Sequence, residues 1–207
     1  GKDSSLGSPI AIEDASDYIF GISLVNDWSA RDIQKWEYVP LGPFVSKSFA
    51  TSISYWVTPL EALKPFLVKG PKQDPTPLSY LANKNPLTHY DINLTVELET
   101  ANKDREIISR ANMKWLYWSI EQQLSHHTIT GCNVRIGDLL ASGTISGTEP
   151  SSYGSLLELS WNGEKPLSIN KNTRRSFLED GDKITISACA NKDQVKIDES
   201  QKKGDLL

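Results

Sequence analysis

Four polar residues of complementary chemistry recur at helical intervals in the first quarter of the chain. Asp27, Arg31, Gln34 and Tyr38 are separated by four, three and four positions. With Asp27 as the N-cap of a helix over residues 28–37, this spacing places all four on one stripe. A carboxylate, a guanidinium, an amide and a phenol suit a metal ion and an oxygen-rich anionic ligand. Considered alone, however, the spacing is more typical of a solvated helix face with one ion pair.

Two further polar residues follow a proline-rich turn. Lys47 and Thr51 lie just before an alternating apolar run, Ile53 to Val57, which predicts a strand. A lone lysine is normally a solvated surface charge. Because Lys47 is flanked by Val45 and Phe49, it is also placed to be drawn inward as a fixed cation.

The last third of the chain contributes one threonine and one glutamate. Thr144 lies in the sequence SGTISG, where glycines permit a close backbone approach to a ligand and the hydroxyl can donate to an oxyanion. Glu158 lies in the sequence LLELS, within a strand predicted from Tyr153 to Trp161. A carboxylate there is either exposed or buried with a partner, and the residues alone favour exposure.

The adjacent histidines His126 and His127 are the most conspicuous remaining candidates for a metal site. Neighbouring residues point to different sides of a helix, so the pair is a poor bidentate ligand. No His-x-x-x-His or Cys-x-x-Cys motif lies nearby. We interpret the pair as structural, for example at a helix C-terminus.

The elements that must position these residues are mostly strands. Strands are predicted by apolar or alternating runs at 21–25, 91–100, 105–110, 153–161 and 182–189. Helices are predicted at 28–37, at 58–66 with Thr58 as N-cap, and at 112–128 with Asn112 as cap and Gly131 beyond its end. Residues 69–85 predict a long loop. A β-rich α+β fold follows, a roll or sandwich with peripheral helices.

Composition excludes several classes of protein. The chain has 207 residues, 38% of them hydrophobic, enough for one sizeable core. A net charge of −4 and a pI of about 5.4 give no basic footprint for nucleic acid. No apolar run approaches the roughly 20 residues that span a bilayer, so no membrane partner is expected. Two cysteines, Cys132 and Cys189, predict a reducing compartment rather than a disulfide scaffold.

The amino-acid sequence around the first motif is more specific for a protein family than the spacing of its polar residues. NDWSARDIQKWEYVPLGPF at residues 26–44, followed by KSFATSISYWV at 47–57, resembles the fumarylacetoacetate hydrolase family. The resemblance is nearly continuous from Gly21 to Trp161. Acylpyruvate hydrolases and oxaloacetate decarboxylases of the same superfamily share the N-D-x-S-A-R-D-x-Q core and a Lys-Ser-Phe element. They lack the YVPLGPF insert, so the insert favours the fumarylacetoacetate branch over an acylpyruvate substrate.

The resemblance implies a reaction and a role for each candidate residue. The reaction is metal-dependent hydrolysis of the carbon–carbon bond of 4-fumarylacetoacetate to fumarate and acetoacetate, the last step of tyrosine and phenylalanine degradation. Glu158 orients the catalytic histidine that activates water, and Lys47, Arg31 and Gln34 complete the catalytic set. Gln34, Tyr38, Thr144 and Arg31 contact substrate. Asp27, Lys47 and Thr51 belong to the metal site, for which Mg²⁺ or Ca²⁺ is expected.

The resemblance also implies the setting of the site. The expected fold is the mixed β-sandwich roll of the superfamily, here incomplete at its N-terminal side, in a cytoplasmic homodimer. The family's catalytic histidine and most of its metal ligands lie upstream of the segment matching residue 1. We therefore expect residues 1–207 to be a partial C-terminal catalytic domain, inactive alone. The alternative is an interaction module without activity.

The end of the chain departs from the family pattern. Residues 191–207 are charged and polar, with the sequence NKDQVKIDESQKKGDLL after Ala190. The family continues here into a glycine-rich closing segment. Such a composition predicts a divergent, disordered polar tail.

Overall fold

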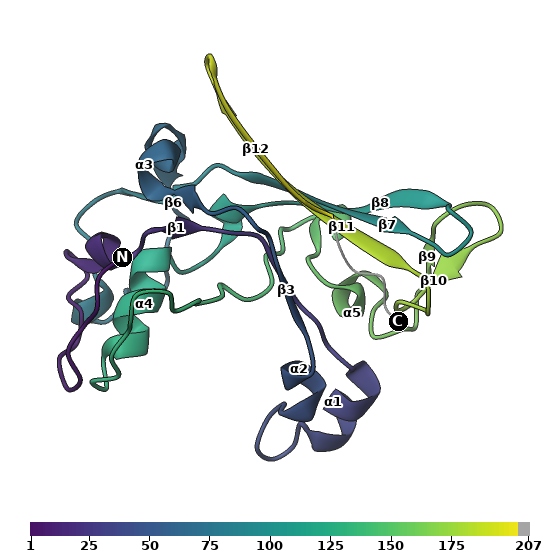
Figure 1. Cartoon of the computed structure of the whole chain (residues 1–207), viewed down its shortest axis with the longest axis horizontal. Helices are drawn as coiled ribbons and strands as arrows, with labels where there is room; N and C mark the ends of the chain where they lie inside the picture. Colours follow the sequence, from purple (N-terminus) through teal and green to yellow (C-terminus); the bar gives the residue numbers. More distant parts are fainter. Residues whose placement is uncertain (203–207) are drawn as a thin grey trace.

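The computed structural model of the protein describes residues 1–202, with side chains through residue 199. It is a mixed α+β fold whose largest sheet is antiparallel, with strand order β12-β11-β7-β8 (Figure 1). The bounds of these strands are β7 Asn93–Glu99, β8 Arg105–Asn112, β11 Lys183–Lys192 and β12 Val195–Lys202. Several two-stranded sheets and short helices surround it.

The β7–β8 hairpin confirms the clearest strand prediction. Its strands pair from Asn93 opposite Asn112 to Glu99 opposite Arg105, with a bulge after Val96. Alternation in β7 turns Leu98 fully inward, where it packs with Ile108 and Ile184. Apolar burial of this kind is the main stabilising force of the sheet.

The prediction of a disordered tail is wrong for the described part of that segment. Residues Val195–Lys202 form β12, and each of them is paired with β11. The side chain of Glu199 accepts hydrogen bonds from the hydroxyls of Ser54 and Thr58, so β12 is also attached to the first third of the chain. Residues 203–207 lie outside the described residues.

Within residues 1–202, the remaining strands form four antiparallel pairs. They are β1 Gly21–Ile22 with β4 Thr58–Pro59, β2 Val25–Asp27 with β3 Thr51–Ile53, β5 Leu67–Lys69 with β6 Leu87–Tyr90, and β9 Leu167–Ser168 with β10 Arg174–Arg175. A second core lies beside the large sheet, where α3 (Leu60–Leu63) and the 3-10 helix η2 (Lys64–Phe66) bury Leu63 and Phe66.

The other helices are short. They are η1 Ala15–Tyr18, α1 Arg31–Glu37, α2 Val45–Ser48, η3 Ser79–Leu81, η4 Met113–Trp115, α4 Ile120–Thr128, η5 Pro150–Ser152 and α5 Leu156–Leu159. Across the described part of the chain, none is long and apolar enough to cross a membrane. The predicted loop at 69–85 is confirmed apart from Lys69, which ends β5, and η3.

Two predicted helix starts are wrong. The helix predicted from Asn112 begins only at Ile120, because Ser119 and Gln122 form a reciprocal capping box there. Asn112 ends β8 and caps η4 through Lys114 N. Thr58 lies in β4 rather than at a helix N-cap.

Residues 28–50 form a projection that we call the arm. It contains α1, α2 and the loop between them, and it extends away from the large sheet at the end of the β2–β3 pair (Figure 1). The carboxylate of Glu37 accepts hydrogen bonds from the Ser46 hydroxyl and from the backbone N–H groups of Phe44, Val45 and Ser46. Glu37 therefore fixes α1 against α2.

Candidate active site

Asp27 and Lys47 form the base of the candidate site, where the arm joins the strands. The Lys47 ammonium lies 2.9 Å from Asp27 Oδ2 and 3.3 Å from the Asp27 carbonyl oxygen. Thr51 pairs with Asp27 across β2 and β3. The prediction of Asp27 as a helix N-cap is wrong, because the cap position is Ala30 and Asp27 is engaged by Lys47.

Arg31 and Gln34 lie one helical turn apart in α1 and are bonded to each other. Arg31 Nη1 donates to Gln34 Oε1 at 2.7 Å, and both residues are half-buried. Partial burial lowers the pKa of Arg31, while the negative charges of Glu158 and Asp27 act in the opposite direction. The charges of two carboxylates, Asp27 in β2 and Glu158 in α5, therefore act on Arg31.

Glu158 lies in a helix rather than in the predicted strand. Ser155 is the N-cap of α5, and its Oγ accepts from the backbone N–H of Glu158. The Ser155 hydroxyl also donates to Glu158 Oε2 at 2.8 Å. The sequence Ser155-x-x-Glu158 is the signature of a capping box, and it is a local signal for a helix start at this position. The Glu158 side chain is half-buried, not exposed as its residues alone predicted.

Ser146, like Ser155, contacts Glu158 but was not predicted from the sequence. Its hydroxyl donates to the two Glu158 carboxylate oxygens, at 2.9 and 3.1 Å. Ser146 Oγ also accepts from Gly154 N at 3.0 Å. The loop that carries Thr144 is therefore attached to the helix that carries Glu158. Thr144 itself is exposed.

Tyr38 is not brought into the same group. It lies at the C-terminal end of α1 and is 56% exposed. Among the described residues, its hydroxyl has no hydrogen-bond partner. The structure thus joins Lys47 to Asp27 and Arg31 to Gln34, and it pairs Thr51 with Asp27. Glu158 acts on Arg31 through its charge and is bonded to Ser146 and Ser155, while Tyr38 and Thr144 are exposed.

The described residues do not by themselves fit a divalent metal ion. Within residues 1–202, no group of three His, Cys, Asp or Glu side chains is close enough to hold one. The carboxylate of Asp27 is also engaged by Lys47. The two adjacent histidines have separate partners, since His126 Nδ1 contacts the Tyr80 hydroxyl at 2.9 Å and His127 contacts Cys132 at 3.7 Å.

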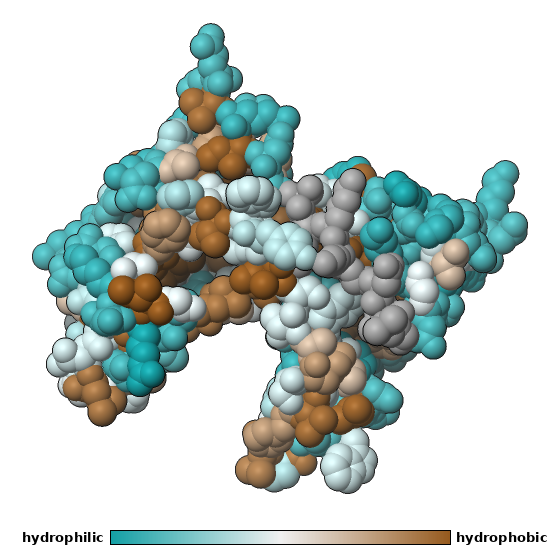
Figure 2. All heavy atoms as spheres, viewed as in Figure 1, coloured by the Kyte–Doolittle hydropathy of each residue, from teal (hydrophilic) through white to brown (hydrophobic). Residues whose placement is uncertain are grey.

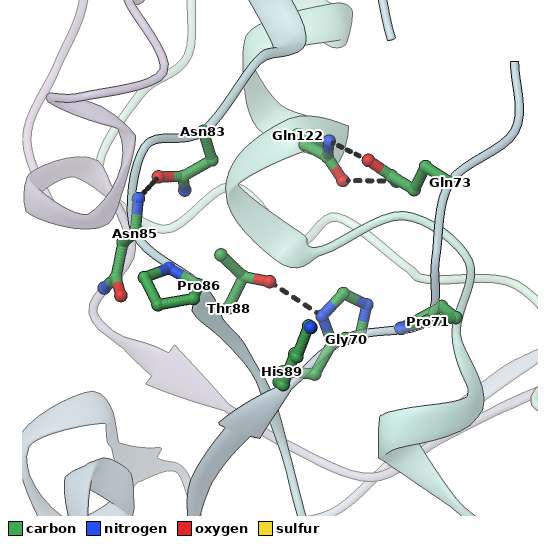
Figure 3. Close-up of a pocket in the computed structure, with 10 residues that line it drawn as sticks. Gly70, Pro71, Gln73, Asn83, Asn85, Pro86, Thr88, His89 and Gln122 are labelled. Atoms are coloured by element: carbon green, nitrogen blue, oxygen red, sulfur yellow. Dashed lines mark hydrogen bonds between the residues drawn. The ribbon is translucent and has the colours of Figure 1, made fainter. Parts of the chain in front are cut away.

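A polar cavity of about 150 Å³ lies elsewhere, between β6, α4 and the loop after β5 (Figure 3). Its polar groups bond to one another. The amides of Gln73 and Gln122 exchange two hydrogen bonds, at 3.0 and 2.9 Å. His89 accepts from the Thr88 hydroxyl and donates to the Leu116 carbonyl, since a carbonyl oxygen only accepts. None of the predicted site residues lines this cavity.

Comparison with known proteins assigns the family. The family described as fumarylacetoacetate (FAA) hydrolase C-terminal matches residues 4–201. The chain is 57% identical to the fumarylacetoacetase of Arabidopsis thaliana over 198 residues, which cover 95% of this chain and 47% of that protein. It is 52% identical to the Homo sapiens fumarylacetoacetase and 50% identical to that of Caenorhabditis elegans, in both cases over all of this chain and 49% of the relative.

The chain spans about half the length of the curated relatives it matches. The matched half is the C-terminal one, and it includes the arm, α5 and the large sheet. The resemblance noted in residues 26–57 therefore extends over nearly the whole chain. This chain belongs to the fumarylacetoacetate hydrolase family.

Proposed function

We propose that this protein acts as a fumarylacetoacetase, the activity named for its relatives. The reaction is hydrolysis of 4-fumarylacetoacetate to fumarate and acetoacetate, the last step of tyrosine and phenylalanine degradation. The observation that carries the proposal is the Lys47–Asp27 ion pair at the base of the arm, close in sequence to Arg31, whose pKa the negative charge of Glu158 acts to raise. These residues come from α1, α5, β2 and α2, and each was expected at the site from the resemblance.

The negative charges of the substrate account for the presence of two cationic side chains, Arg31 and Lys47, at the site. Fumarylacetoacetate has a carboxylate at each end and a 1,3-diketone between them, so it presents two anionic groups and polar carbonyl oxygens. Arg31 and Lys47 are suited to bind these groups, with Gln34, Tyr38 and Thr144 as further hydrogen-bonding contacts. Because Arg31 is half-buried, its charge is less screened by water than a surface arginine.

The chemical step requires addition of water and departure of a carbanion. Water adds to the ketone carbon of the fumaryl group, and the bond from that carbon to the methylene carbon of the acetoacetate unit breaks. The bond's electron pair leaves with acetoacetate as an enolate, which then takes up a proton, while the fumaryl carbon becomes a carboxylate. A fixed cation such as Lys47 or Arg31 stabilises the developing enolate charge.

Glu158 acts by positioning the base that removes a proton from water. Two serine hydroxyls hold its carboxylate, so its orientation is fixed before substrate binds. The base is the family's histidine, which we expect from the half of the relatives that this chain does not match. Residues 1–207 are then a partial catalytic domain and inactive alone.

The metal requirement follows from the resemblance. Mg²⁺ or Ca²⁺ would polarise the diketone. Asp27 is the carboxylate that this chain would contribute, together with Thr51, and the other ligands are expected from the unmatched half. The complete fold would be the mixed β-sandwich roll of the superfamily, in a cytoplasmic homodimer. The two free cysteines, Cys132 and Cys189, support a reducing compartment.

The test joins this chain to the N-terminal half of the Arabidopsis fumarylacetoacetase and measures fumarylacetoacetate cleavage with Mg²⁺. We expect turnover by the joined protein and none by the chain alone. Glu158→Gln should reduce kcat at least 100-fold, whereas Glu164→Gln, at an exposed glutamate outside the site, should leave it unchanged. Cleavage of an acylpyruvate instead would favour the alternative substrate. Inactivity towards both would favour an interaction module.

A further inference from the structure

Apolar side chains gather on the exposed arm (Figure 2), whereas the cavity between β6 and α4 is lined almost entirely by polar ones (Figure 3). Apart from one glycine and two prolines, each residue that lines the cavity has a polar side chain. Among the described residues, no aspartate or glutamate lines it, and Lys69 places a positive charge at its exposed rim. Such a lining favours a negatively charged ligand. At roughly 30 Å³ for each water molecule, the cavity of about 150 Å³ holds a ligand of about five non-hydrogen atoms.

One wall of the cavity is a pair of glutamine amides that are fully engaged within the chain. The N–H groups of Gln73 donate to the Tyr117 carbonyl and to Gln122 Oε1, at 2.8 and 3.0 Å. Those of Gln122 donate to the Leu81 carbonyl and to Gln73 Oε1, both at 2.9 Å. An amide nitrogen carries two hydrogens, so neither glutamine has a donor left for a ligand. The pair therefore fixes the shape of the cavity.

The opposite side of the cavity presents donors that remain free. Asn83 Oδ1 accepts from Asn85 N, and Asn85 Oδ1 accepts from Leu87 N, both at 2.9 Å. A backbone N–H can only donate, so these contacts fix the amide oxygens and leave the two amide nitrogens as donors. Within residues 1–202, neither nitrogen has a hydrogen-bond partner, and Lys69 forms no ion pair. These groups suit the oxygen atoms of an anion.

Thr88 and His89 complete this side, and their hydrogen bond depends on the charge of the imidazole (Figure 3). Because the Leu116 carbonyl accepts from Nε2, the Nδ1 atom of neutral His89 accepts from the Thr88 hydroxyl. When His89 is protonated, Nδ1 becomes a donor to the Thr88 oxygen. The Thr88 hydroxyl hydrogen is then released towards the cavity. Protonation thus adds both a donor and a positive charge.

Burial lowers the pKa of His89, and the hydrogen bond to the Leu116 carbonyl opposes this only in part. The titratable side chains on the segments around His89 are those of Lys69, Lys72, Asp74, Tyr80, Lys84, Tyr90, Lys114, Tyr117, Glu121 and His126. None of them is among the causes of the shift. An anion beside His89 would raise the pKa again, because it favours the charged ring.

We propose that this cavity binds a small oxyanion of the size of sulfate or phosphate, and that His89 takes up a proton from solvent when the anion binds. Asn83, Lys69 and the released Thr88 hydroxyl donate to the oxygen atoms of the anion, and the imidazolium balances its charge. The cavity contains none of the residues of the candidate active site, so the proposal is independent of the proposed function.

The first experiment measures sulfate binding by calorimetry, because sulfate keeps the same charge from pH 5.5 to pH 7.5. We expect the affinity of the unchanged chain to rise about fivefold or more over this range as the pH falls, since a proton binds with the anion. Asn83→Asp keeps the oxygen that accepts from Asn85 N but exchanges the free donor for a negative charge, and it should weaken binding about tenfold or more. Asn102→Asp adds the same charge at an exposed turn and should leave binding unchanged.

The second experiment tests the proton. His89→Gln retains an N–H for the Leu116 carbonyl but cannot be protonated in this range, so its sulfate affinity should no longer depend on pH. His126→Gln, at an exposed histidine of α4 outside the cavity, should retain the dependence. In proton NMR of the unchanged chain, sulfate should move the titration of the His89 ring to higher pH. This last measurement, like Asn83→Asp, does not require that His89→Gln fold.

Three results would overturn the proposal. One is a sulfate affinity that does not change with pH, or whose change survives in His89→Gln. Another is binding that ignores Asn83→Asp but is lost in Lys47→Met, because the anion would then occupy the candidate active site. The third is binding by the chain alone that disappears in the joined protein, since the cavity would then be covered there.

Discussion

The large sheet and the arm of this protein are stabilised in different ways. In the sheet, Leu98, Ile108 and Ile184 are buried against one another from three strands. In the arm, Ser46 is the single buried residue of positions 28–50. The sheet therefore owes its stability to apolar burial within the chain, whereas the arm keeps its shape through hydrogen bonds centred on Glu37.

Two ion pairs, one just before β11 and one at the base of the arm, show the same contrast. Arg175 donates to Asp182 from two nitrogens, at 2.7 and 3.0 Å, and the Asp182 side chain is fully buried. Lys47 and Asp27 meet at 2.9 Å with 31% and 53% of their side chains exposed. The arm thus leaves both charged and apolar side chains exposed to solvent. Such side chains contribute little to the stability of the chain but remain accessible to a ligand. The comparison can be tested by removing one interaction at a time.

The largest effect is expected from Arg175→Met, which leaves the buried Asp182 charge without its main partner. Burial alone would raise the pKa of Asp182, but hydrogen bonds from Arg175 and the backbone outweigh it and lower the pKa overall. The variant should lose about 3–5 kcal/mol in urea unfolding at neutral pH. In the unchanged chain, this pair's contribution is present above the ordinary aspartate pKa and disappears as pH falls through the lowered value. A loss under 1 kcal/mol would contradict this account.

Leucine truncation compares the two regions directly. Leu98→Ala removes a fully buried side chain from β7 and should cost about 2–5 kcal/mol, because a cavity remains. Leu41→Ala, at 77% exposure on the arm, should change stability by no more than about 0.5 kcal/mol. Similar losses in both variants, measured by urea unfolding, would show that the arm is buried in the isolated chain.

An intermediate effect is expected at the contact between the Thr144 loop and α5. Ser146→Ala removes the hydroxyl that bonds Glu158 and should cost about 1–2 kcal/mol, since a hydrogen bond to a charged group is lost. Ser146→Thr keeps a hydroxyl and should recover most of that loss. If alanine and threonine behave alike, the hydroxyl does not hold Glu158.

The regular parts of the sheet could be predicted from the sequence because their signal is local. Alternation in residues 91–100, followed by a short polar turn, was sufficient for the β7–β8 hairpin. The strand ending near Cys189 was equally predictable, since a Gly-Asp turn precedes an apolar run. β12 was not, because its polar residues gain their order from backbone pairing to β11.

The site could be predicted as a set of residues but not as a set of contacts. Asp27 fits an N-cap by local chemistry, yet its partner is Lys47, twenty positions away. Glu158 fits a strand by its leucine neighbours, yet Ser155 caps a helix turn there. In both cases a side-chain contact overrides the local sequence signal. Ser146 was missed because its role exists only once the loop and α5 meet.

Glu37 offers a local test of how the arm is held. The Ser46 hydroxyl and three backbone N–H groups bind its carboxylate, and they lower the pKa to about 2 although burial acts the other way. This anchoring is complete above the usual glutamate pKa of about 4.3 and is lost only as pH falls through about 2. Hydrogen exchange at Phe44, Val45 and Ser46 should therefore stay slow at pH 4. Glu37→Gln should accelerate it, with amides of β7 as the unchanged control.

The smallest effect is expected for Lys47→Met, which opens the ion pair at the base of the arm. Because both charges are substantially exposed, the loss should be about 0–1 kcal/mol and should shrink further in 1 M salt. Urea unfolding at low and high salt measures both. A loss near that of Arg175→Met would mean that Asp27 is buried in solution and that the site is already closed. A small, salt-sensitive loss means that the pair can open at little cost, as a site that must accept a ligand requires.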